Sequence, residues 1–353
     1  MLRFIVRRLL GAIPTLLIII AMAFFLMRVA PGGPFDQERN LPPEIEKNIL
    51  AAYDLDKPLL QQFLEVNPLV CRAFISGDHA GMAAEAAKAG LSYDGAKYVT
   101  GEKRHVRCLG GYVGKLMGGD FGPSYKMKDF TVAELIADGA PVSALLGVSA
   151  ILLALTIGMT MGTVAALRQN RFSDYSIMTI AMIGITVPSF VMAPVLTLIL
   201  GVNLGWLPVG GWNNGAIENM ILPIVSLSLA QIAVISRLTR GSMIEVLRSN
   251  YVRTARAKGL PERLVITRHA LRAAILPLVS YLGPATAGIV TGSLVIEQIF
   301  NLPGIGKYFI NGALQRDYTL VMGVVILYAS LVIFLNLVAD VIYGLLDPKI
   351  RYD

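Results

Sequence analysis

Long apolar segments separated by short polar ones form the dominant pattern of this chain. A bilayer core of about 30 Å takes roughly 20 helical residues, and six uncharged stretches approach or exceed that length. They predict six membrane-spanning helices at residues 9–27, 140–167, 175–200, 219–236, 273–296 and 318–339. The strands of a membrane barrel would alternate in short runs between turns, which this sequence does not do. The expected fold is an all-α integral membrane protein.

Helix-loosening and small residues occur inside several of these stretches. Membrane helices tolerate proline where neighbouring protein or a water-filled path satisfies the backbone, and here the prolines are Pro188, Pro194, Pro223, Pro277 and Pro284. Glycines four residues apart let helices approach closely. The pairs are Gly158 with Gly162 and Gly288 with Gly292.

Composition supports the membrane assignment. The chain has 353 residues, of which 55% are hydrophobic and 16% charged, more apolar side chain than a soluble domain of this length buries. The first stretch could instead be a signal peptide, because three arginines precede it and Ala21-Met22-Ala23 resembles a cleavage site. We favour a retained span, since the apolar run exceeds the usual 7 to 15 residues and the alanines lie inside it.

Basic residues set the expected orientation, because they concentrate on the cytoplasmic side. With a cytoplasmic N-terminus, the inner segments 1–8, 168–174, 237–272 and 340–353 carry three, two, nine and two Lys or Arg. Segment 31–139 has 12 basic and 15 acidic residues, so it is expected outside. Four parts follow: 1–30 with the cytoplasmic N-terminus and first helix, the external lobe 31–139, a five-helix core 140–346 containing the cytoplasmic loop 237–272, and a cytoplasmic tail 347–353.

The external segment is too long for a simple connection. Ile45, Ile49, Leu50 and Tyr53 recur at helical spacing and predict a short amphipathic helix. The Ala- and Gly-rich part, about 66–110, is interpreted as a small capping lobe, with a poorly ordered insertion as the alternative. Both cysteines, Cys71 and Cys108, lie in this external segment; they are a candidate disulfide, or two free thiols.

Motifs for several kinds of chemistry are missing from the sequence. Gly114-Lys115 and Gly306-Lys307 are not followed by Ser or Thr, so no P-loop occurs. A membrane enzyme with a serine nucleophile needs a base nearby, yet all three histidines fall outside the predicted spans. A proton-coupled carrier working alone would want a carboxylate near mid-membrane. Glu297 and Asp340 lie at span ends and are expected to be solvated or helix-end charges. No metal site and no nucleic-acid partner are expected.

The stretch YVRTARAKGLPERLVITRHALRAAILP, residues 251–277, concentrates positive charge between two apolar segments. Its basic residues are Arg253, Arg256, Lys258, Arg263, Arg268 and Arg272, against the single acid Glu262. Positive-inside bias and attraction to anionic lipid account for the amount of charge. They do not account for the order of the residues.

That order predicts a short helix. Ser249 or Asn250 can cap its start, and Gly259 followed by Pro261 can end it. The apolar residues Tyr251, Val252 and Ala255 would share one face, forming a knob suited to a cleft in a partner protein. Enlarging Ala255 is then expected to block docking.

The same residues carry a resemblance. RTARAKG followed by RHALRAAILP resembles the cytoplasmic coupling loop of ATP-binding-cassette importer permeases, in the peptide branch. Arg253 and Thr254 stand where the general motif has Glu and Ala, whereas Ala255 and Gly259 match it. LMRVAPGGPF at 26–35, GDFGPSYKMKDFTVAELI at 119–136, NLPGIGKYFINGALQRDYTLVMG and the terminal DPKIRY resemble the B-type membrane subunits of oligopeptide permeases. The resemblance omits about 66–110.

This resemblance implies a multi-pass subunit of the bacterial inner membrane, with both termini cytoplasmic and no catalytic site of its own. It implies four kinds of partner besides peptide and lipid: a second permease subunit, two ATP-binding subunits that hold ATP and Mg, and an external peptide-binding protein. Import of dipeptides, glutathione or a metal chelate is the alternative, and the substrate path is not assigned. The residues implied to dock on the ATPase are Tyr251, Val252, Arg253, Thr254, Ala255, Arg256, Ala257, Lys258 and Gly259.

Overall fold

Two compact units make up the computed structural model, which describes residues 2–29, 47, 55–66, 92–94, 97–99, 105–106, 109–127 and 129–346. Unit 1 comprises Met1–Leu17, Leu135–Leu314 and Val324–Asp353. Unit 2 comprises Ile18–Glu134 and Gln315–Gly323.

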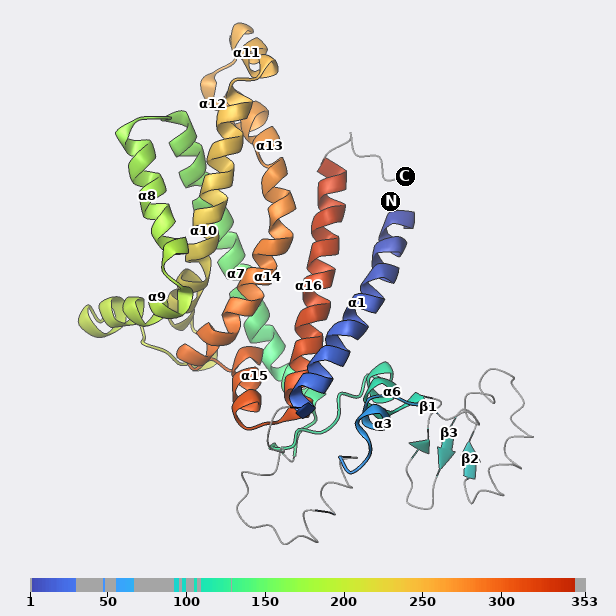
Figure 1. Ribbon diagram of the computed structural model, residues 1–353. Helices are drawn as coiled ribbons and strands as arrows, with labels where there is room; N and C mark the ends of the chain where they lie inside the picture. Colours follow the sequence, from blue (N-terminus) through green and yellow to red (C-terminus); the bar gives the residue numbers. More distant parts are fainter. Residues whose placement is uncertain are drawn as a thin grey trace. The chain divides into compact units, whose positions relative to one another are not determined.

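Helices make up nearly all of the described chain (Figure 1). Four of them are long and apolar enough to cross a membrane by themselves: α1 (Leu2–Val29), α7 (Val132–Leu167), α10 (Ile217–Leu247) and α16 (Tyr318–Leu346). Two bent pairs raise the number of candidate spans to as many as six. One pair is α8 (Phe172–Thr186) with α9 (Ser189–Leu196) and the π-helical turn Thr197–Asn203, and the other lies within α14 (Leu276–Ile299).

The third expected span, residues 175–200, is not one straight helix. α8 ends at Thr186, and the helical segment that follows is turned by 105°. Val187 is extended, with φ −97° and ψ 121°, because the ring of Pro188 disfavours helical backbone in the residue before it. Pro188 therefore breaks the helix, whereas the sequence had indicated only loosening. Within α14 the bend is milder, at 41°.

Close packing of α7 on α10 depends on Gly158 and Gly162. A Cβ atom on Gly158 would lie 2.7 Å from Cγ2 of Ile235, and one on Gly162 would lie 2.5 Å from the carbonyl oxygen of Ser236. Any larger residue at either position would push the two helices apart. The close approach predicted for this glycine pair is confirmed.

The expected cytoplasmic loop 237–272 is mostly helical. α10 continues to Leu247, and α11 (Asn250–Ala257), α12 (Glu262–Leu264), a π-helical segment Val265–Ala270 and α13 (Leu271–Ala274) follow. Within unit 1, α11 lies toward the same end as the start of α1 and the end of α16 (Figure 1). The loop, the start of α1 and the end of α16 therefore share one side of this unit.

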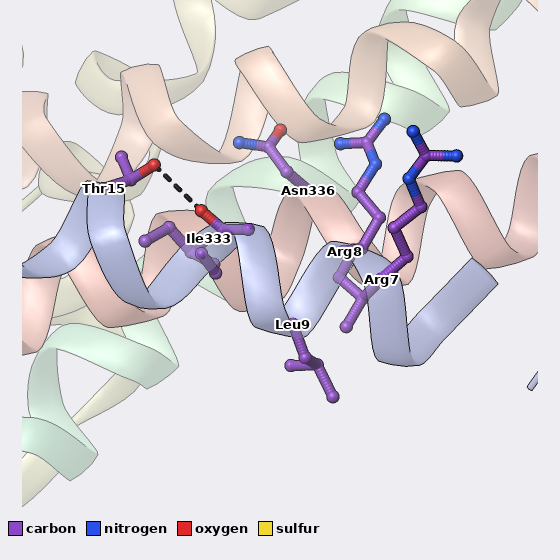
Figure 2. A pocket seen from close by; sticks show the side chains of 9 residues that line it. Arg7, Arg8, Leu9, Thr15, Ile333 and Asn336 are labelled. Atoms are coloured by element: carbon purple, nitrogen blue, oxygen red, sulfur yellow. Dashed lines mark hydrogen bonds between the residues drawn. The ribbon is translucent and has the colours of Figure 1, made fainter. Parts of the chain in front are cut away.

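Near that end of unit 1, α1 and α16 enclose a groove of about 500 Å³. Figure 2 shows Arg7 and Arg8 at one end of the groove and Thr15 at the other. Arg8 forms an ion pair of 2.9 Å with Asp340. Asp340 was expected to be a solvated or helix-end charge; it is partly exposed and neutralised by this pairing between α1 and α16.

Glu297 lies near the end of α14, as expected, but it is fully buried and is therefore not a solvated charge. Its Oε2 accepts a hydrogen bond of 2.7 Å from the backbone N–H of Gly306, in the first turn of α15 (Ile305–Leu314). The neighbouring N–H of Ile305 donates to Oγ of Ser143 at 2.9 Å. The first amides of a helix have no partner within it, so these side chains satisfy them and fasten α15 to α14 and α7. This carboxylate is structural.

Unit 2 contains short helices and strands after the end of α1. α3 (Leu59–Phe63) packs on α6 (Gly111–Met117). The strands are β1 (Glu65–Val66), β2 (Ser92–Asp94), β3 (Lys97–Val99), β4 (His105–Val106) and β5 (Leu109–Gly110). β1 pairs antiparallel with β5, and β2-β3-β4 form an antiparallel sheet. The all-α expectation therefore fails within the lobe, where β1 and β5 bring the two ends of segment 66–110 side by side.

Two predictions about the lobe fall outside the described residues. They are the amphipathic helix with Ile45, Ile49, Leu50 and Tyr53, and the candidate disulfide between Cys71 and Cys108. The described core of unit 2 includes Phe24, Tyr112, Tyr125 and Tyr318. Buried Asp317 accepts a hydrogen bond from Ser124, which ties residues 315–323 to the lobe.

Candidate functional site

The predicted short helix in the basic stretch exists as α11, Asn250–Ala257. Ser249 occupies the position before it, with extended backbone at φ −70° and ψ 153°, so the predicted start is confirmed. Its hydroxyl does not cap α11, however. It donates backwards to the carbonyl oxygen of Val246 at 2.6 Å, and so joins the start of α11 to the end of α10.

One face of α11 turns into the chain's own core, which corrects the expected knob. Val252 is 0% exposed and Ala255 is 5% exposed. Both pack in a cluster with Ala166, Met243, Val265, Ala270 and Ala274. Val252 and Ala255 therefore seat α11 on the ends of α7, α10 and the segment after α12 and are not available to a partner protein, whereas Tyr251, the third residue of the expected stripe, is exposed.

The opposite face of α11 is exposed and carries small and basic residues. Tyr251 is 46% exposed, and Arg253, Thr254, Arg256, Ala257, Lys258 and Gly259 are also exposed. We call Tyr251, Arg253, Thr254, Ala257 and Lys258 the outward face. Thr254 and Ala257 leave little side chain between the helix backbone and a docking protein, while Arg253 and Lys258 supply positive charge beside them.

The turn after α11 is fixed by glycine and by an ion pair. Gly259 has φ +74°, a conformation that glycine adopts at little cost. Beyond the turn, Glu262 accepts hydrogen bonds of 2.6 and 3.1 Å from the guanidinium of Arg256. These bonds lower the pKa of the Glu262 carboxyl. The single acid of the basic stretch thus holds the turn closed.

We expect Gly259→Ala and Gly259→Val to reduce coupling without altering membrane insertion. A side chain at positive φ costs about 1 to 2 kcal/mol, and more for β-branched valine, so the turn should shift although no atom lies within 4 Å of the added Cβ. Gly241→Ala is the matched control, because Gly241 also has open space around it but lies in ordinary helix. ATPase activity of the assembled complex is the measurement, and equal activity in the three variants would contradict the role of this turn.

A buried ion pair that the sequence did not predict supports the base of this region. Asp174 of α8 is 0% exposed, and its two carboxylate oxygens accept hydrogen bonds of 2.7 Å each from Nε and Nη2 of Arg240 in α10. The backbone N–H of Asn170 donates to the same carboxylate at 2.9 Å. The turn between α7 and α8 is thereby clamped to α10. The sequence does show a carboxylate, Asp174, at the start of an apolar helix. It does not show which residue pairs with it, because Arg240 lies 66 residues further along the chain.

Together these contacts pack the ends of α7, α8 and α10 against one another and against α11. The arrangement can pass movement of α11 to α10, since Ser249 and the cluster around Val252 connect the two. Across the part of the chain that the structure describes, no group of three or more His, Cys, Asp or Glu could hold a metal ion.

Comparison with known proteins finds relatives that match this chain along its length. The model of the family "Binding-protein-dependent transport system inner membrane component" matches residues 154–352, and its N-terminal companion matches residues 1–102. The chain is 50% identical over 352 residues to the oligopeptide transport system permease proteins OppB of Salmonella typhimurium and Escherichia coli, with 100% of each chain covered. It is 37% identical to the dipeptide transport system permease protein DppB of Bacillus subtilis, with 99% of this chain and 98% of the relative covered.

Proposed function

Because this chain belongs to the family of binding-protein-dependent transport system inner membrane components, we propose that it is the membrane-spanning subunit of an ATP-driven oligopeptide importer. In this role it forms half of the translocation path. The observation that carries the proposal is the 50% identity to OppB along the whole of both chains. The lower identity to DppB, 37%, favours oligopeptides over dipeptides.

The proposed complex supplies the chemistry that this chain lacks. Two partner subunits bind ATP with Mg and hydrolyse it, a second permease subunit completes the path, and an external binding protein delivers the peptide. This chain has no catalytic residue in the proposal. Its task is to convert the closing of the ATPase subunits into a change in the side of the membrane to which the translocation path is open.

The outward face of α11 is the proposed contact with an ATPase subunit. Movement there reaches α10 through Ser249 and the buried cluster, and reaches α8 through the ion pair of Asp174 with Arg240. A ligand shifts an equilibrium between two states only by binding them with different affinity. The ATPases would do so by holding α11 differently when open and closed.

The proposed orientation places α11 and both termini in the cytoplasm and the lobe outside, in a bacterial inner membrane. The nine basic residues of 237–272 support this, because basic residues concentrate on the cytoplasmic side. Six spans are proposed, with each bent pair counted as one crossing. An even number of crossings returns the chain to the side on which it began.

Reconstituted transport tests the proposal. Vesicles containing this chain, its partner permease and the ATPases should take up labelled oligopeptides only when ATP and the binding protein are both present. A panel including dipeptides, glutathione and a metal chelate would identify the alternative substrates. Uptake that persists without ATP would overturn the proposal in favour of a secondary carrier.

The paired strands at the base of the lobe lead to a deletion prediction. Val66 and Leu109 are antiparallel neighbours, so their Cα atoms are roughly 5 Å apart and a two-residue Asn-Gly turn can join them. We expect deletion of residues 67–108 to spare membrane insertion and assembly with the ATPases, and to affect docking of the binding protein if it affects anything. Co-purification of the subunits checks this, and failure to assemble would place the insertion in the core fold.

A further inference from the structure

The groove between α1 and α16 combines a charged end with apolar walls (Figure 2). Arg7 and Arg8 lie at its charged end, and the apolar side chains of Ala12, Ile333 and Leu337 also line it. Its volume of about 500 Å³ is within the range of roughly 300 to 1,000 Å³ that small-molecule sites have. The groove is therefore large enough for a ligand with one charged end and an apolar body.

The length of the groove matches one leaflet of a bilayer. Thr15 lies eight positions after Arg7 in α1, and at a rise of 1.5 Å per residue the two are about 12 Å apart along the helix. One leaflet contributes roughly 15 Å, half of the hydrocarbon core. Both α1 and α16 are long and apolar enough to cross a membrane, and the two arginines directly precede the uncharged run 9–27. The charged end of the groove is therefore expected at the membrane surface, with its apolar walls beside the lipid chains.

The described charges at the mouth of the groove sum to one positive charge. Arg7 and Arg8 line this end, and Arg8 is paired with Asp340 at 2.9 Å. Arg7 is exposed, and no acidic side chain within the described part of the chain pairs with it. Its guanidinium can therefore donate two parallel hydrogen bonds to a phosphate group. One net positive charge favours a headgroup with a net negative charge over a zwitterionic headgroup, whose net charge is zero.

A half-buried amide adds a second polar feature to the groove. Asn336 belongs to the apolar helix α16, and Figure 2 shows its side chain between Thr15 and the two arginines. Its amide makes no hydrogen bond with the residues that the structure describes. A polar group without a partner is costly in hydrocarbon. The ester carbonyl oxygens of a phospholipid, which lie between its phosphate and its acyl chains, would accept hydrogen bonds from this amide.

We propose that this groove holds one anionic phospholipid, with its phosphodiester at Arg7 and one acyl chain between α1 and α16. Charge selects the headgroup, while the length and apolar walls of the groove select a lipid over a free phosphate ion. Basic pockets between membrane helices are known to bind lipid headgroups. The inference goes beyond the proposed function. It requires only that α1 and α16 cross a bilayer, so it can fail while oligopeptide import stands.

Photolabelling in vesicles tests the site. The full transport complex is placed in vesicles of equal phosphatidylglycerol and phosphatidylcholine, and in each sample one of the two lipids carries a photoreactive group in its acyl chain. The measurement is labelling of α16 between Ile333 and Leu337, expressed as the ratio of the phosphatidylglycerol probe to the phosphatidylcholine probe. We expect Arg7→Gln to lower this ratio about fivefold, the attraction of one surface arginine for anionic lipid, and Arg7→Lys to retain most of it.

Arg168→Gln is the matched control for charge, because Arg168 is an exposed arginine outside the groove, in the turn between α7 and α8. It should leave the ratio unchanged. A ratio in Arg7→Gln that equals the wild-type ratio overturns the proposal. Labelling that inorganic phosphate alone abolishes also overturns it, because the occupant would then be the free anion.

Gly11→Leu tests the place of the acyl chain. Gly11 lines the groove, and no atom lies within 4 Å of a Cβ added to it, so leucine would fill the groove without displacing α1. We expect labelling of α16 by both probes to fall severalfold, whereas Gly11→Ala, which adds a single methyl group, should retain it. Unchanged labelling in Gly11→Leu overturns the proposal. So does labelling that is present in the chain alone and absent from the complex, because a partner subunit would then cover the groove.

Discussion

Asp174→Ala is expected to be the most damaging single change at the base of the coupling region. It would leave Arg240 partly buried without its counter-charge, and breaking a buried ion pair costs about 3 to 5 kcal/mol. We expect the lower end of that range, because the Arg240 side chain is 28% exposed and water can partly replace the carboxylate. The apparent melting temperature of the purified complex should fall, and assembly with the ATPases should fall with it.

A double variant separates the ion pair from the space it fills. Asp174→Leu with Arg240→Met replaces the pair with apolar side chains, a change that is often neutral when both charges are removed together. We therefore expect the double variant to be closer to wild type in melting temperature than Asp174→Ala. If the double variant is less stable than Asp174→Ala, leaving Arg240 unpaired is not what destabilises Asp174→Ala, and the argument from the broken ion pair is wrong.

Several helices could be predicted from local signals. Uncharged runs of sufficient length coincide with the four to six candidate spans, and Ser249 and Gly259 bounded α11 because both act on the backbone nearby. The severity of the bend at Pro188 was not predictable, since proline can kink a membrane helix or end it depending on what surrounds it. Likewise, Asp174 showed that a charge was present but not that Arg240 would meet it.

The orientation of α11 is the clearest case of what periodicity leaves open. Val252 and Ala255 share a face by their spacing, which identifies an apolar stripe. Spacing does not say whether that stripe packs on the same chain or on a partner. Only the packing of α7, α10 and the segment after α12 around it decides the matter, and it places the stripe inside.

Ala257→Trp is expected to lower peptide-stimulated ATP hydrolysis strongly while leaving this chain stable. Ala257 is exposed in the isolated chain, where a substitution usually changes stability by less than about 0.5 kcal/mol. In a close contact with an ATPase subunit the same side chain would overfill the interface, at about 1 to 3 kcal/mol, enough for a loss near tenfold or more. Hydrolysis by the reconstituted complex, alongside melting temperature, is the measurement.

Ala255→Trp provides the matched comparison, because it adds the same side chain two positions away on the buried face. It should lower the melting temperature as well as hydrolysis, since it breaks the packing that seats α11. A surface that merely attaches to anionic lipid predicts a different order: neutralising Arg253, Arg256 and Lys258 together would do most harm, and Ala257→Trp would be harmless. Full stimulation in Ala257→Trp would therefore defeat docking through the outward face, whereas loss of stimulation at unchanged stability is the result that attachment to lipid cannot produce.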